Sequence, residues 1–149
     1  MIQSYMKMAM EEAMKAKQKG DVPVGAVIVK DSKVIARGHN MRRHKNNALL
    51  HAEMHAIEKA CRKLSSCFLD DCDIYVSLEP CPMCAGAILQ ARIKRLYFGA
   101  YDPKAGCAGS LANLFALPFS HRVEVYGGIE EDANMALLSN FFSELRKSK

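Results

Sequence analysis

The chain has 149 residues, of which 50% are hydrophobic and 25% are charged, and it carries a formal net charge of +5. This length fits one domain with a substantial core, and the modest positive charge permits a polyanionic partner without requiring one. No apolar run approaches the roughly 20 residues that a membrane span needs, and the N-terminus lacks a signal-peptide pattern, so we expect a cytoplasmic protein with reduced cysteines and no membrane partner.

The first part of the chain predicts a helix followed by a hairpin. Apolar residues recur at three- and four-residue spacing from Ile2 to Lys19, which indicates an amphipathic helix that ends at Gly20. Residues Val22–Val29 form a nearly continuous apolar run, which is typical of a strand covered on both faces. After a polar turn, Val34–Arg37 predicts the second strand.

A polar and basic loop, Met41–Asn47, then leads to His51. By itself such a loop is typical of a solvated connection. From His51 to about Lys63 the apolar residues again follow a helical period, so we expect a second helix that begins close to His51.

The second half of the chain predicts three more strands and three more helices. The expected strands are Asp73–Leu78, Arg95–Gly99 and Arg122–Tyr126, and the expected helices start near Pro82, at Leu111–Ala116 and at Glu130–Lys147. In the last helix we expect six apolar residues to face inward: Ala133, Leu137, Leu138, Phe141, Phe142 and Leu145. The sum is an α/β fold with three α/β/α layers, a five-stranded sheet between helices.

Three side chains have the chemistry and number of a catalytic zinc site. His51, Cys81 and Cys84 supply one imidazole and two thiols, which leaves the fourth position of a tetrahedral ion open for water. Cys81 and Cys84 are three apart at a helix start, where the helix dipole favours thiolate. Glu53 is two residues from His51, so both can serve one centre only if it lies off the first helical turn.

Other interpretations of these residues remain. Cys81-Pro82-Met83-Cys84 alone is equally compatible with a redox dithiol or half of a structural zinc ribbon, although no second Cys-x-x-Cys exists. His51 and His55 are four apart, as in zinc proteases, but Ala52 stands where that motif needs Glu. We expect the remaining residues of these types to be ordinary core or surface positions: Cys61, Cys67, Cys72, Cys107, His39, His44, His55 and His121.

The combination of His-x-Glu with Pro-Cys-x-x-Cys about thirty residues later is a known signature of zinc-dependent nucleobase deaminases. On wider stretches the chain resembles the bacterial tRNA-specific adenosine deaminase family, within the cytidine deaminase-like fold. The resemblance covers nearly the whole chain and is carried by Pro23–Val27, Gly38–Asn40, His51–Glu53, Leu78–Ala87, Phe98–Ala100, Asp102–Lys104, Gly106, Gly109–Leu111 and Leu137–Ser139. Residues 1–149 would then be a single CMP/dCMP-type zinc deaminase domain with a mixed sheet.

The resemblance implies hydrolysis of adenosine to inosine at the wobble position, 34, of a tRNA anticodon. One Zn²⁺ per subunit, held by His51, Cys81 and Cys84, would acidify its water to hydroxide, which attacks C6 of adenine. Glu53 would act as the proton shuttle. A single-stranded anticodon base can be splayed into a pocket at a smaller unstacking cost than a paired base.

The resemblance also implies substrate contacts and partners. Asn40 matches a base-binding asparagine, Ala52 a small residue whose N–H faces the base, and Val24 a further substrate-binding position. Asp102 and Lys104 match a loop that contacts neighbouring nucleotides. The expected partners are the anticodon stem-loop of a tRNA and a second copy of the chain, which completes each active site in a homodimer.

Alternatives of other classes stay open. A guanine, cytosine or nucleoside deaminase acting on a free small molecule would use the same zinc and Glu53 without needing Asp102 or Lys104. A non-catalytic zinc-stabilised subunit is disfavoured by the presence of Glu53. The chain also departs from the family before His51, where Asn47–Leu50 replace the usual Asp-Pro-Thr-Ala.

Overall fold

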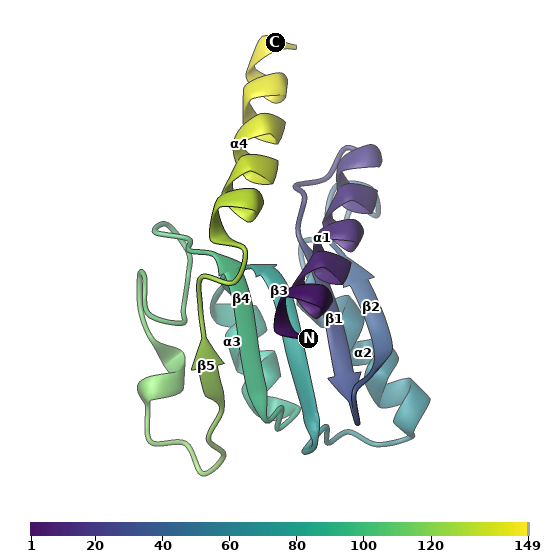
Figure 1. Cartoon of the computed structure of the whole chain (residues 1–149), viewed down its shortest axis with the longest axis vertical. Coiled ribbons are helices and arrows are strands. Elements are labelled where there is room, and N and C mark those ends of the chain that lie inside the picture. The colour runs from purple at the N-terminus through teal and green to yellow at the C-terminus, as the bar shows by residue number, and fades with distance from the viewer. Residues whose placement is uncertain (149) are drawn as a thin grey trace.

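The computed structural model describes residues 1–148, and these form a central sheet with helices on both faces (Figure 1). The elements in chain order are α1 (Ile2–Gln18), β1 (Gly25–Lys30), β2 (Lys33–His39), α2 (Ala52–Leu64), β3 (Cys72–Leu78), α3 (Pro82–Gln90), β4 (Arg95–Ala100), the 3₁₀ turn η1 (Leu114–Ala116), β5 (Glu124–Tyr126) and α4 (Glu131–Lys147). Within these residues no helix is both long and apolar enough to cross a membrane.

The five strands form one mixed sheet in the order β2-β1-β3-β4-β5. β1 pairs antiparallel with both β2 and β3, whereas β3, β4 and β5 run parallel to one another. The parallel pairs need crossovers, and α3 makes the one between β3 and β4. The α/β/α fold with a five-stranded mixed sheet is thus confirmed.

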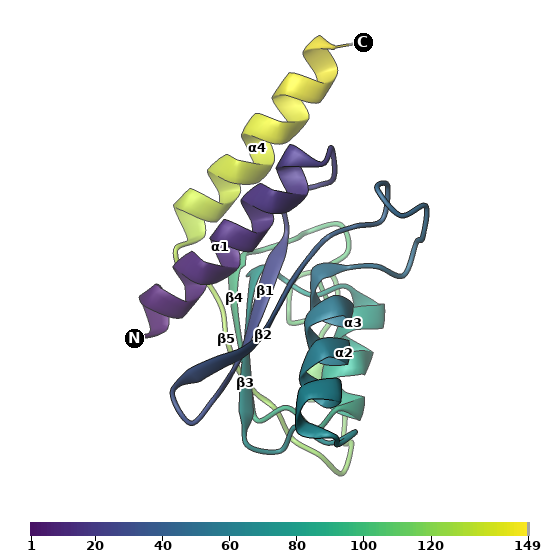
Figure 2. The same ribbon diagram turned by 90° about the vertical axis from the view of Figure 1, so that its right-hand side faces the viewer.

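Two hydrophobic cores lie on opposite faces of the sheet. α2 and α3 cover one face, and α1 and α4 lie on the other (Figure 2). The larger core includes buried residues from α2, α3 and the central strands, such as Ala56, Ile88 and Phe98. The smaller one packs Met6 and Ala9 of α1 on the opposite side of β1, β3 and β4. Because β1 and β3 are covered on both faces, their side chains are apolar on both sides, as the run at Val22–Val29 predicts.

α2 sits close to β2 because Gly38 has no side chain. A Cβ atom at Gly38 would lie 2.5 Å from the carbonyl oxygen of Ala52, which is closer than non-bonded atoms approach. The glycine therefore lets the first turn of α2 reach the end of the sheet. This contact fixes the depth at which the segment around His51 enters the molecule.

The structure corrects some boundaries and faces. The first strand begins at Gly25 and not at Val22, and the predicted helix Leu111–Ala116 is only the short turn η1. In α4, Ala133 and Phe142 are exposed although the periodicity predicts them to face inward. The second half of α4, which carries Phe142, extends beyond the ends of the strands, so there is little protein for Phe142 to pack against (Figure 1). Cys67 is also exposed, whereas Cys72 and Cys107 are buried.

Candidate active site

His51 occupies the N-cap position of α2, with φ −75° and ψ 156°. Its carbonyl accepts the N–H of His55 and so begins the helical hydrogen-bond pattern. Glu53 follows in the first turn of α2 and is 3% exposed. The imidazole and the carboxylate are therefore both delivered by one helix start.

Cys81 occupies the equivalent position at the start of α3. It is the N-cap residue, with φ −73° and ψ 174°, and Pro82 follows at the first helical position, where the missing N–H costs nothing. Cys84 lies in the first turn and is fully buried. β3 and α3 are joined by only three residues, Glu79 to Cys81, so the strand end fixes where the two thiols lie.

The two helix starts bring three possible metal ligands together. The His51 Nδ1 atom lies 3.6 Å from the Cys81 Sγ atom and 3.5 Å from the Cys84 Sγ atom. One ligand atom from each residue lies within 4.8 Å of the others, and this is the only such group of three among residues 1–148. These side chains could hold a metal ion, as their spacing in the sequence predicts.

Burial and mutual hydrogen bonding shift the ionisation of this cluster. The hydrogen bond from Cys84 lowers the pKa of the Cys81 thiol to about 4, and the hydrogen bond with Cys81 raises the pKa of His51. The pKa of Cys84 is raised, because its proton is shared with Cys81 and because it is buried. Burial raises the pKa of Glu53 to about 7. These contacts favour the thiolate form of Cys81, the form of cysteine that binds metals.

The predicted base-contacting residues lie around the entrance of the loop before α2. Asn40 follows β2 and is 6% exposed; its N–H donates to the carbonyl of Val24, and its side chain donates to the carbonyl of Val22. The N–H of Met41 donates to the carbonyl of Leu50, so Asn40 and His51 flank the base of one loop. Ala52 is the first residue of α2 and is fully buried. Their substrate roles stay predictions.

Asp102 and Lys104 lie in the loop after β4, which is attached to the segment that carries Cys81. The N–H of Cys107 donates to the carbonyl of Pro80, and the Asp102 side chain accepts the N–H groups of Lys104 and Ala105. Lys104 is exposed. Both predicted nucleotide contacts therefore lie on a loop tied to the metal-ligand segment, and their roles also stay predictions.

Sequence reasoning missed a buried carboxylate that organises this loop. Glu79 is 2% exposed and accepts the N–H groups of Asp102 (3.0 Å), Ala108 (2.9 Å) and Ser110 (3.1 Å), together with the Ser110 hydroxyl. These hydrogen bonds keep the pKa of Glu79 below its ordinary value although burial opposes this. Gly106 touches the carboxylate so closely that no larger residue fits there.

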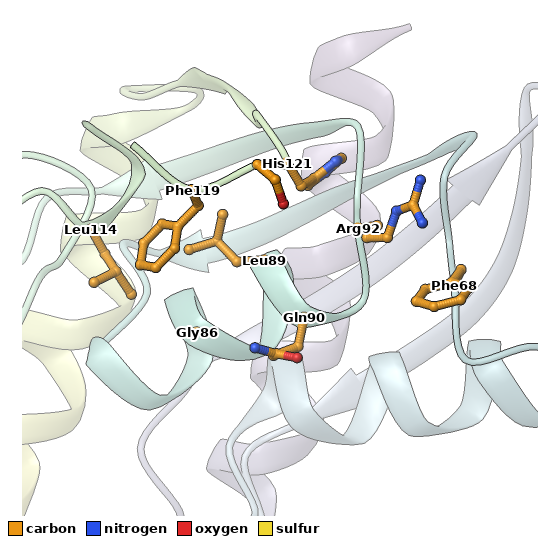
Figure 3. A pocket seen from close by; sticks show the side chains of 9 residues that line it. Phe68, Gly86, Leu89, Gln90, Arg92, Leu114, Phe119 and His121 are labelled. Carbon is orange, nitrogen blue, oxygen red and sulfur yellow. The ribbon is translucent and has the colours of Figure 1, made fainter. Parts of the chain in front are cut away.

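A cavity of about 540 Å³ lies elsewhere, between α3 and the segment after η1. Figure 3 shows Gly86 and Leu89 of α3 beside Leu114, Phe119 and His121. None of the predicted site residues lines it. The cavity is therefore separate from the cluster formed by His51 and the two cysteines.

Comparison with known proteins identifies the relatives of this chain. Residues 2–146 match the family model described as MafB19-like deaminase. The tRNA-specific adenosine deaminase of Bacillus subtilis is 49% identical over 146 residues, covering 97% of this chain and 91% of that protein. A solved structure from a study of A-to-I editing by tRNA:A34 deaminases has a TM-score of 0.87 and 44% identity, covering 91% of this chain and 99% of that one. The guanine deaminase of Bacillus subtilis is also similar, with a TM-score of 0.66, 41% identity, and coverage of 80% and 79%.

Proposed function

Because the chain belongs to the tRNA-specific adenosine deaminases, within the MafB19-like deaminase family, we propose that it hydrolyses adenosine to inosine at the wobble position of a tRNA anticodon. The observation that carries the hydrolytic chemistry is the convergence of His51, Cys81 and Cys84 beside the buried Glu53, and the identity to a tRNA-specific adenosine deaminase favours this substrate. We further infer that residues 1–149 form one zinc deaminase domain, since both cores pack on the same sheet.

The donor set fits one zinc ion. Tetrahedral zinc with bonds of about 2.3 Å to sulfur and about 2.0 Å to nitrogen would separate those two ligand atoms by roughly 3.5 Å. The observed separations of His51 Nδ1 from the two sulfurs are 3.6 and 3.5 Å. His51, Cys81 and Cys84 would therefore hold one Zn²⁺ per chain and leave its fourth position free. When bound, zinc acidifies water at that open position.

The chain's own residues carry the remaining chemistry. Glu53 is close to the ligands but is not one of them, so its carboxylate is free to take a proton from the attacking water, pass it to the ring nitrogen and assist the departure of ammonia. Addition of water at C6 and loss of ammonia convert adenosine to inosine, so atoms balance without a further reactant. Burial excludes bulk water from Glu53.

Asn40 orients the base. Its amide has two N–H donors and two acceptor sites, of which the structure uses one donor for Val22 and one acceptor for Arg42. One donor and one acceptor remain for a purine edge. The N–H of Ala52 belongs to the first helical turn, whose N–H groups have no partner within the helix, and it can donate to the base as well.

Besides the tRNA, we propose that the chain binds a second copy of itself and forms a homodimer. α3 contains no charged residue, and the exposed Phe119 lines the same cavity as Gly86 and Leu89 of α3. Two more exposed apolar side chains occur in the segment 111–119: Leu111 and Leu117. The cavity that Figure 3 shows lies between these elements. Phe119→Glu should shift the zinc-loaded protein from dimer to monomer in light scattering, whereas Phe142→Glu on α4 should not. A monomeric native protein at micromolar concentration would contradict this proposal.

The experiment that tests the activity offers four substrates to the zinc-loaded protein. These are a matched anticodon stem-loop, free adenosine, free guanine and free cytosine, and deamination of each is measured by mass spectrometry. We expect inosine only in the stem-loop. Turnover of guanine without turnover of the stem-loop would instead favour a guanine deaminase, the class to which one similar solved structure belongs.

A further inference from the structure

The loop of residues 41–50 projects from the molecule beside the start of α2 (Figure 2). Its ends are joined by the hydrogen bond from Met41 N–H to the Leu50 carbonyl, at 2.9 Å. The residues just outside this closure are Asn40 and His51. Whatever contacts the loop is therefore next to the candidate active site.

A buried carboxylate from another segment fixes the shape of this loop. Asp21 is 1% exposed, and its two oxygens accept the N–H groups of Arg43 (2.7 Å) and His44 (3.0 Å). Within residues 1–148 Asp21 has no ion pair, so its charge is stabilised by these donors and not by a cation. Two backbone hydrogen bonds of 2.9 Å inside the loop add to this order.

The fixed loop presents three cationic side chains that form no ion pair in the described part of the chain. Arg42, Arg43 and Lys45 are exposed, and no acidic residue occurs in the sequence between Asp31 and Glu53. In the described part of the chain none of the three cations lies within ion-pair distance of a carboxylate. The Arg42 Nε–H donates to the carbonyl of Ala48. In the described residues, the side chains of Arg43 and Lys45 make no such hydrogen bond.

We propose that the loop 41–50 is an RNA-docking surface, on which Arg43 and Lys45 bind backbone phosphates of nucleotides that flank the target base. The inference rests on the proposed function and adds where the RNA is held. Phosphate contacts set the position of a nucleic acid without reading its sequence, and fixed cations beside the site suit that task. Asp21 is a positioning residue, because it holds the backbone from which these side chains project.

The test measures binding of a labelled anticodon stem-loop that carries inosine, the product base, so that no turnover interferes. Its dissociation constant is determined between about 50 and 200 mM salt, the range over which phosphate contacts change affinity strongly. The variant is Arg43→Gln with Lys45→Gln. The matched control is Lys33→Gln with Lys63→Gln, which removes the same charge from two exposed cations at the start of β2 and near the end of α2, away from the loop (Figure 2).

We expect the Arg43/Lys45 variant to bind more weakly and to lower the slope of log affinity against log salt by about 0.7 for each lost contact, or about 1.4 in all. The control pair should leave the slope unchanged, and both variants should keep the wild-type zinc content. An unchanged slope in the Arg43/Lys45 variant, or an equal fall in the control, would overturn the inference. Because binding is measured without turnover, a protein that binds RNA here but deaminates no stem-loop would refute the proposed function alone.

Discussion

Glu53 lies in the first turn of α2, buried beside the three candidate ligands. Since it is placed to move protons and not to bind metal, Glu53→Gln should lower kcat by roughly 10²–10⁴-fold. Zinc content, measured on the same preparation, should stay at the wild-type level. Loss of zinc in this variant would show that the carboxylate is a ligand, which contradicts the assigned role.

The charge of Glu79 should contribute to stability, because its carboxylate accepts three N–H groups and one hydroxyl from the loop after β4. Glu79→Gln keeps the size but turns an acceptor oxygen into a donor that faces N–H groups. We expect the free energy of unfolding to fall by about 1–3 kcal/mol, measured by urea denaturation of the zinc-loaded protein. The control Glu58→Gln breaks only an exposed pair with Arg62 and should cost about 0.3–0.5 kcal/mol. Equal losses in both variants would contradict the role of Glu79.

The candidate ligands could be predicted from the sequence, but the two carboxylates that fix the neighbouring loops could not. Cys81 and Cys84 are close in sequence, and their helical spacing carries the information. Glu79 and Asp21 act on backbone N–H groups that lie 22 to 31 residues further along the chain. Such contacts leave no periodic trace, because any residue type supplies the donor. Burial, which only the structure gives, is what identifies them.

At the scale of the elements, the predicted helices and strands are largely correct because apolar periodicity reflects burial. α2 and β4 differ from their predicted bounds by only a residue. The exceptions have local causes. Val22 and Val24 are apolar, yet they precede β1, because the Val24 N–H donates to the Val22 carbonyl and so closes a turn. Phe142 is exposed in the second half of α4, which extends beyond the sheet (Figure 1). Pattern alone does not show where a packing partner ends.

At the junction of α1, β2 and α2, we expect a buried histidine to make stability depend on pH. His39 lies against Glu12 (3.3 Å), Lys19 (3.3 Å) and His55, and burial lowers its pKa below the ordinary value of 6.5. A depressed pKa means that the folded state favours neutral His39. This stabilisation is complete above pH 6.5 and is lost as the pH falls through the lowered value, at about 1.4 kcal/mol for each unit of depression.

Replacing His39 by glutamine should therefore remove part of this pH dependence. We expect the difference in unfolding free energy between the native protein and His39→Gln to shift in favour of the variant as the pH is lowered from 7.5 to 5.5. Urea denaturation at several pH values measures it. A difference that stays constant over this range would show that His39 does not titrate differently in the folded and unfolded states.

At the scale of the whole molecule, a sheet between two helical layers brings the starts of α2 and α3 to one place. The order of the layers and the directions of the strands depend on connections that the sequence only suggests. The two helix starts, in contrast, can be recognised as a pair because one carries a histidine and the other two cysteines. The site depends on that pairing: one layer supplies the imidazole and both thiols, and the sheet fixes their separation.

The metal centre is tested most directly by the zinc content and the X-ray absorption spectrum of the native protein and of Cys84→Ala. We predict one zinc per native chain, with two sulfur ligands at about 2.3 Å and one imidazole nitrogen at about 2.0 Å. Cys84→Ala should lose the metal. Zinc at the native stoichiometry in that variant, or a native spectrum without sulfur ligands, would contradict the metal centre on which the proposed activity depends.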